Sequence, residues 1–314
     1  MTEPAEPQYS LKVWHLAVAM ALVVVHLVFA WLTRVPSITV GNDDALYLLL
    51  SQSVQSFQYL NAHIVGAPPH GQYPPGYPAF LAVWTGLFGG SLDTVLVAGM
   101  LMSATALVFV FDLARRLYGG GLALAVLAAL AVNPALVHYA GRVASEPPFM
   151  LLLVLGFWVA MVLPEGRRRL FALGILAILA AMTRSVGICL VLALGLVWLL
   201  ERRWKAVAVF GIAVALTVGT WLLWTSVAPG RIVPRSYAAT VVKTANRASG
   251  QWLGALWDRG VTAVDVYGAH SVPSSLSVPT ISGTSLDNLF WSAVIVLTLA
   301  ASVIAFRKRL RLLP

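Results

Sequence analysis

Charged residues are scarce in this sequence: Asp, Glu, Lys and Arg together make up 11% of the 314 residues, whereas 59% are hydrophobic. With a mean hydropathy of +0.83, this balance excludes an ordinary water-soluble domain. Cys189 is the single cysteine, so an intrachain disulfide is excluded, and its apolar surroundings predict a position in the core. The sequence also shows no nucleotide-binding glycine loop, no Cys/His zinc pattern and no nucleophile elbow.

Long runs rich in Leu, Ala and Val dominate instead. Because these runs do not alternate with polar residues, and because lipid admits only helices or closed barrels, we expect an all-α polytopic membrane protein. About eight transmembrane helices are predicted, at residues 12–33, 92–114, 119–141, 147–163, 170–184, 187–200, 206–227 and 287–306. The stretch from 170 to 200 fits either two short helices with a turn at 183–187 or one overlong helix. We favour two helices, which keep both flanking basic clusters on one side of the membrane.

Basic residues gather in short clusters between these runs, at Arg115–Arg116, Arg167–Arg169, Arg202–Lys205 and Arg307–Arg311. Such clusters orient membrane spans, so the formal charge of +9 does not predict a nucleic-acid partner. Positive charge favours the cytoplasmic side, and both termini are therefore expected there. Since no organelle signal is present, we expect a bacterial cytoplasmic (inner) membrane.

Two polar segments are predicted to lie on the outer side. In the first, residues 34–77, helical spacing over about 44–60 predicts an amphipathic surface helix, with an apolar face of Leu46, Leu49, Leu50, Val54 and Phe57. Residues 77–90 would form only about 21 Å of helix against a hydrocarbon core of about 30 Å, so we expect an interfacial or re-entrant segment. The predicted division is a transmembrane module at 1–227, an outer loop at 228–286 and a last span with a basic tail at 287–314.

Five motifs in this order resemble the GT-C superfamily of polytopic glycosyltransferases, in particular its family 39 and aminoarabinose-transferase type. They are Asp43-Asp44-Ala-Leu-Tyr47, Tyr73-Pro-Pro-Gly-Tyr77-Pro78, Arg115-Arg116-Leu-Tyr-Gly, Arg142 with Ser145-Glu146-Pro147, and Thr183-Arg184. The resemblance implies a polyprenyl-phosphate sugar donor, an active site on the outer face of about seven spans, and inversion at the anomeric carbon. It also implies that the first acidic residue of the pair Asp43-Asp44 is the catalytic one.

The chemistry of such a transfer needs a base for the acceptor and cations for the departing phosphate. We predict Asp43 as the general base and Asp44 as its reserve. The alternative is that both carboxylates only cap the surface helix. Asp43, Asp44 and Glu146 are also the candidate ligands of a divalent metal ion, Mg²⁺ or Mn²⁺.

Arg184 is the leading candidate for a phosphate ligand, because a guanidinium group holds phosphate in a bidentate fork. The alternative is a buried ion pair or a side chain that reaches the interface. Glu146 is expected on the same side as Asp43, where it orients the acceptor, shares a metal or pairs with Arg142. Otherwise it is only an acidic first turn of a helix. The other predicted substrate contacts are Arg142, Tyr47, Tyr73, Tyr77, His70, Arg231 and Arg235, although a solvated loop histidine is favoured for His70 and His63.

These residues favour a membrane glycosyltransferase that passes a sugar to a saccharide, lipid or protein acceptor. Two alternatives stay open. One is a non-catalytic protein that binds or translocates a lipid-linked saccharide, and the other is a short transferase that needs a partner subunit. A non-catalytic protein would keep Arg184 but would have no need for Asp43.

Overall fold

The computed structural model describes residues 12–38 and 43–227, and within these ranges helices are the only regular elements apart from one isolated β-bridge between Leu60 and Pro69. This confirms the all-α prediction for the described part of the chain. The helices are α1 Val13–Leu32, α2 Asp43–Gln55, α3 Gly76–Phe88, α4 Leu92–Tyr118, α5 Gly120–Ala131, α6 Pro134–Ala140, α7 Glu146–Val162, α8 Arg167–Thr183, α9 Ile188–Leu200, α10 Trp204–Val214 and α11 Thr220–Val227. A 3-10 turn, Ser185–Gly187, precedes α9, and a π-helical segment, Ala215–Gly219, joins α10 to α11.

Three of the described helical segments are long and apolar enough to cross a membrane: Val13–Leu32, Leu92–Tyr118 and the continuous Trp204–Val227. The pair α5 and α6 becomes a fourth if the two helices are counted as one span, although they meet at an angle of 61°. Helices α3 and α7 and residues 185–200 are apolar but shorter. The chain is thus a membrane protein, and the predicted total of eight spans stays a prediction because 287–306 lies outside the described residues.

Two sequence predictions are corrected here. The single helix expected over 119–141 is broken after Ala131. The surface helix expected over 44–60 ends at Gln55, since Phe57 adopts a φ of 55° and is fully exposed, so it does not belong to the apolar face. By contrast, the choice of two helices over 170–200 is confirmed, because Arg184 is extended and ends α8.

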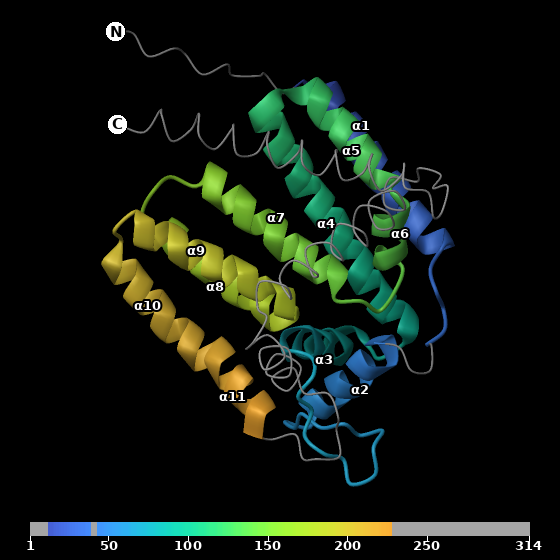
Figure 1. The fold of residues 1–314 in the computed structure, drawn as a ribbon. Helices are drawn as coiled ribbons and strands as arrows, with labels where there is room; N and C mark the ends of the chain where they lie inside the picture. The colour runs from blue at the N-terminus through green and yellow to red at the C-terminus, as the bar shows by residue number, and fades with distance from the viewer. Residues whose placement is uncertain (1–11, 39–42, 228–314) are drawn as a thin grey trace, which may run out of the picture. The chain divides into compact units, whose positions relative to one another are not determined.

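Contacts divide the chain into two units, and the packing described below belongs to the first, Met1–Val132 with Leu136–Val242. In this unit α4 packs against α1, α5 and α7, and the row continues through α8, α9 and α10 (Figure 1). Small residues such as Ala104, Ala114, Ala123 and Ala131 are buried between α1, α4 and α5, which lets these helices approach closely. Cys189 is exposed on α9, so its predicted core position is wrong.

The two ends of this helix bundle differ in chemistry. At one end Asp112, near the end of α4, pairs with Arg115 and Arg116 and accepts a hydrogen bond of 2.8 Å from the indole of Trp158 in α7. The loops 163–166 and 201–203 lie at this basic end, where Arg203 joins Glu165 at 2.9 Å. Because α7 and α8 are antiparallel and are joined at the basic end, the start of α7 and the end of α8 lie at the opposite end, where α2 and α3 also lie.

Gly76 at the start of α3 marks a close approach that fixes this opposite end. A Cβ atom on Gly76 would lie 2.5 Å from the carbonyl oxygen of Met182 in α8, too close for any side chain. We expect Gly76→Ala to lower the melting temperature by several degrees. Gly86→Ala in the same helix is the matched control, because no atom lies within 4 Å of the added carbon, and its helix propensity gains about 1 kcal/mol. Thermal unfolding of the two purified variants checks this, and equal melting temperatures would contradict the close approach.

Candidate active site

Asp43 opens α2, and its side chain is tied to a loop 30 residues further along the chain. The hydroxyl of Tyr73 donates a hydrogen bond of 2.5 Å to Asp43 Oδ1. Asp43 is exposed, and Asp44 beside it is half-buried. Both carboxylates lie in the first turn of the helix, where the helix dipole favours negative charge. The capping interpretation and the catalytic one are therefore both compatible with this position, and the bond from Tyr73 is what fixes the direction of the Asp43 carboxylate.

A second polar cluster forms where α7 begins and α8 ends. Arg184 Nη1 lies 2.5 Å from Glu146 Oε1 and donates a hydrogen bond of 3.0 Å to Ser145 Oγ. Ser145 is buried and its hydroxyl is also 3.1 Å from the hydroxyl of Tyr47 in α2. Glu146 thus pairs with Arg184, whereas the alternative partner Arg142 contacts the ring of His138 at 3.0 Å.

Asp43 and Glu146, from the two clusters, line one open cleft of about 320 Å³, whereas Tyr73, Ser145 and Arg184 lie behind this lining. Its lining residues are Asp43, Asp44 and Tyr47 from α2, Tyr139 from α6, Arg142, Val143 and Ala144 from the connection to α7, and Glu146 at the start of α7. The structure thus gathers the predicted carboxylates and Arg142 around one solvent-accessible space. Ser145 and Tyr139 had no assigned role in the sequence analysis; Tyr139 stands three residues before Arg142, which is the signal that could have included it.

Three tyrosines, Tyr47, Tyr73 and Tyr77, cluster beside the cleft, and of these three Tyr47 lines it. The ring of Tyr47 lies 5.0 Å from that of Tyr73 and 4.9 Å from that of Tyr77, centre to centre. Burial raises the pKa of Tyr47 to about 12, and burial together with the Asp43 bond raises the pKa of Tyr73. Both hydroxyls therefore stay protonated at neutral pH, and each can donate a hydrogen bond.

His70 packs against Tyr73 of this cluster, and the interpretation of it as a solvated loop residue is wrong. Only 1% of it is exposed. Its Nε2 accepts a hydrogen bond of 2.8 Å from the Tyr73 backbone amide, so Nδ1 donates the 2.7 Å bond to Asn61 Oδ1. Its ring stacks on that of Tyr73, and the indole of Trp224 in α11 donates to its carbonyl oxygen. His63 is exposed, as expected.

This arrangement predicts an acid-sensitive fold. Burial lowers the pKa of His70 to about 4, whereas an unfolded histidine titrates near 6.5. Between these values only the unfolded chain binds the proton, so stability is full above about pH 6.5 and falls by about 3 kcal/mol on the way to pH 4. Melting temperatures measured from pH 7.5 to 4.5 should fall more steeply for the wild type than for His70→Gln. Parallel slopes would contradict a neutral buried His70.

The remaining site predictions concern Arg231, Arg235 and the candidate metal ligands. Arg231 and Arg235 lie outside the described residues. Among the residues that are described, no group of three or more His, Cys, Asp or Glu could together hold a metal ion. Asp43, Asp44 and Glu146 share the cleft, but Glu146 is turned to Arg184. The candidate metal site is therefore not assembled in this arrangement.

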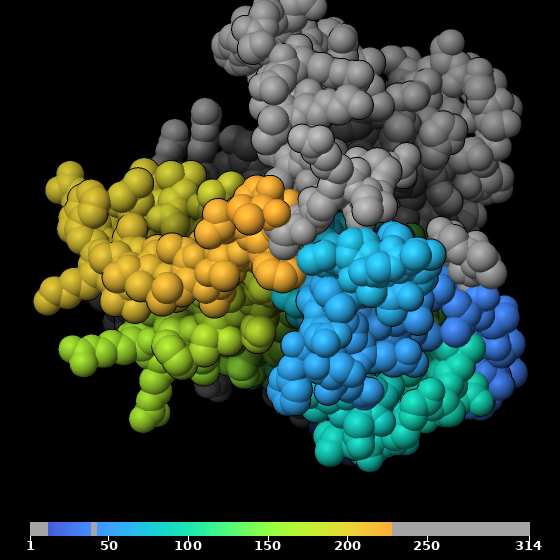
Figure 2. Space-filling view, turned by 90° about the horizontal axis from the view of Figure 1, so that it is seen from below, coloured from blue at the N-terminus to red at the C-terminus, as the bar shows by residue number. Residues whose placement is uncertain are grey.

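Figure 2 shows the end of the bundle opposite the basic one, where residues of α2 and the following loop, in blue and cyan, lie beside α11 in orange. The contact between Tyr59 in this loop and Trp221 in α11, 5.8 Å between ring centres, holds the two together. Apolar helices with a polar, carboxylate-lined cleft at one end define a polytopic membrane protein with a ligand-accessible site. Two comparisons with known proteins show what this membrane protein is similar to.

Residues 72–224 match the family described as dolichyl-phosphate-mannose-protein mannosyltransferase. The fold is similar to that of ArnT from Cupriavidus metallidurans, in a crystal structure bound to undecaprenyl phosphate, with a TM-score of 0.51 and 20% sequence identity. The similarity covers 68% of this chain and 41% of the ArnT chain. No curated protein matches the sequence. Both similarities support the resemblance to the GT-C superfamily that the motifs of the sequence predicted.

Proposed function

We propose that the protein is a membrane glycosyltransferase that moves a sugar from a polyprenyl-phosphate carrier to an acceptor at the outer face of the membrane. One observation carries the proposal: an oriented carboxylate, Asp43, lines the same cleft as Glu146, which forms an ion pair with Arg184. The undecaprenyl phosphate bound to ArnT supports a donor of this class.

In this proposal Asp43 takes the proton of the acceptor hydroxyl or amine as that atom attacks the anomeric carbon. The bond between this carbon and the phosphate oxygen breaks, and the electron pair leaves with the polyprenyl phosphate. The bond from Tyr73 holds the carboxylate in one direction, so the acceptor meets a base that is already oriented. Attack from the side opposite the phosphate inverts the anomeric carbon.

Arg184 is proposed to stabilise the leaving phosphate. Both of its contacts in the described chain use Nη1, so the Nε and Nη2 side of the guanidinium group can present a fork to an oxyanion. Glu146 and Ser145 then hold the guanidinium in place, and Arg142 adds a second cation on the cleft wall. Arg231 and Arg235 are proposed to add positive charge to the outer loop.

The test is turnover by the purified full chain in lipid, with a panel of polyprenyl-phosphate sugars and candidate acceptors. Release of polyprenyl phosphate that depends on an acceptor supports the proposal. Donor binding without release on every donor supports the second candidate, a non-catalytic binder or translocator. Release that appears only after a further membrane protein is added supports a transferase with a partner subunit.

A further inference from the structure

The basic end of the bundle carries an apolar groove that the proposed transfer does not use. This groove, here called the α8–α10 groove, has a volume of about 630 Å³. Its walls are apolar residues of α8 and α10 with Trp198 from α9, namely Leu170, Phe171, Gly174, Ile175, Ile178, Ala206, Val209, Phe210 and Ala213. Arg167, Arg168 and Lys205 line its mouth. The groove is thus apolar along its length and cationic at one end.

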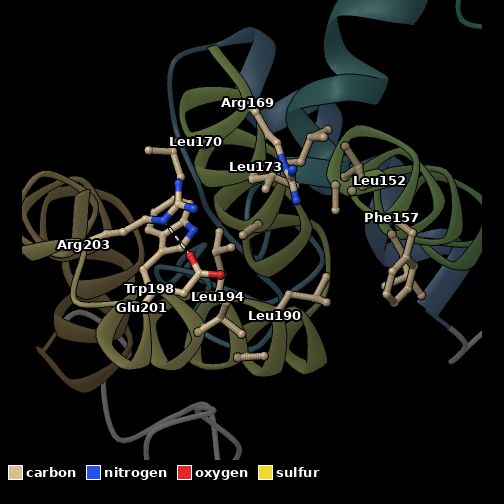
Figure 3. A pocket seen from close by; sticks show the side chains of 17 residues that line it. Leu152, Phe157, Arg169, Leu170, Leu173, Leu190, Leu194, Trp198, Glu201 and Arg203 are labelled. Carbon is tan, nitrogen blue, oxygen red and sulfur yellow. Dashed lines mark ion pairs between the residues drawn. The ribbon is translucent and has the colours of Figure 1, made fainter. Parts of the chain in front are cut away.

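The three cations at the mouth are exposed and make no ion pair with any described carboxylate. A neighbouring groove shows the contrast. It lies between α7, α8 and α9 (Figure 3), and its arginines are neutralised, because Arg203 pairs with Glu201 at 2.6 Å and Arg169 lies 3.9 Å from Glu165. An excess of positive charge therefore distinguishes the α8–α10 groove from its neighbour. This excess favours the binding of an anionic ligand.

The length of the groove indicates what kind of anion fits. From Arg167 to Ile178 the helix rises by about 16 Å at about 1.5 Å per residue, close to the thickness of one leaflet, half of about 30 Å. The mouth therefore lies at headgroup depth when the apolar walls lie among acyl chains. Trp204 is exposed beside Lys205, a position typical of indole rings at the membrane interface.

We propose that the α8–α10 groove is a binding site for an anionic diacyl phospholipid of the leaflet at the basic end. One acyl chain lies along the apolar walls, and the phosphate contacts Arg167, Arg168 and Lys205. Each cation near an anionic lipid contributes about 1 kcal/mol, or about five-fold in affinity. This site is separate from the cleft around Asp43, and its occupancy is independent of the proposed sugar transfer.

Native mass spectrometry of the delipidated full chain tests this proposal, with phosphatidylglycerol and phosphatidylcholine of identical acyl chains as probes. We expect one phosphatidylglycerol adduct, bound at least ten-fold more tightly than phosphatidylcholine. Lys205→Gln should weaken it about five-fold, and the triple change with Arg167→Gln and Arg168→Gln should remove the preference. Arg202→Gln is the matched control, since Arg202 is an exposed cation in the loop 201–203 directly before α10 and does not line the groove.

A second variant distinguishes a lipid bound in the groove from non-specific electrostatic binding at the surface. Ala213→Phe places a ring inside the groove and leaves all three cations, so it should weaken phosphatidylglycerol binding several-fold while the melting temperature checks the fold. Unchanged binding in Ala213→Phe would overturn the proposal. Equal affinity for the two lipids would overturn it too, as would an Arg202→Gln effect equal to that of Lys205→Gln, or a dimer mass without a lipid adduct.

Discussion

Replacing Asp43 by Asn should lower the rate of sugar transfer by about 1,000-fold, within the range of about 10²–10⁴ that a general base contributes. The change preserves the shape of the side chain, and its amide oxygen still accepts the hydrogen bond that Tyr73 donates to Asp43. The orientation of the side chain is thus retained while the proton acceptor is lost. We therefore expect turnover to fall with the affinity for the polyprenyl-phosphate donor nearly unchanged.

Asp93→Asn provides the matched control for this experiment. Asp93 is also an exposed aspartate in the first turn of a helix, and it pairs with Arg34 at 3.5 Å, away from the cleft. The same substitution there should leave transfer within about two-fold, because an exposed ion pair contributes at most about 1 kcal/mol of stability. Full activity of Asp43→Asn, together with a large loss in Asp44→Asn, would move the base to Asp44.

Replacing Arg184 by Ala is the second change with a large expected effect. It removes the guanidinium that contacts both Glu146 and Ser145 and leaves Glu146, about one third exposed, without its partner. Loss of a preorganised donor to a developing oxyanion costs about 10²–10³ in rate. We expect a fall of this size in kcat/KM, measured as polyprenyl phosphate released.

Two further variants show whether this loss reflects chemistry or folding. Arg184→Lys keeps the positive charge but loses the planar fork, so it should recover only part of the rate. Arg203→Ala removes an arginine that contacts two carboxylates at the opposite end of the bundle, and it should retain transfer. Equal losses in Arg184→Ala and Arg203→Ala would show a general effect on folding and would contradict a phosphate-binding role.

Local patterns predicted much of this fold. The apolar runs predicted α1, α4 and the 170–200 helix pair, because the hydrophobic period and the basic flanks report directly on helix length and direction. The surface helix was predicted too, with its end misplaced, because Phe57 continues the apolar spacing while its backbone has already left the helix. The bend after Ala131 was missed, since the apolar residues continue across it.

Several residues that line the cleft were named from the sequence, but the contacts among the candidate site residues could not be predicted. Asp43 and Tyr73 are 30 residues apart, and Ser145 lies 98 residues from Tyr47 and 39 from Arg184. Such contacts depend on how α2, α7 and α8 pack, and no local pattern reports this. His70 shows the same limit, because its burial arises from Asn61, Tyr73 and a tryptophan 154 residues away.

The decisive measurement for Asp43 as the base is acceptor-dependent release of polyprenyl phosphate by the purified protein in lipid, compared between wild type and Asp43→Asn. We expect turnover in the wild type and a loss of about 1,000-fold in Asp43→Asn, with donor binding retained in both. Equal turnover in the two proteins would contradict Asp43 as the base. Donor binding with no turnover of any donor by the wild type would contradict the transferase itself.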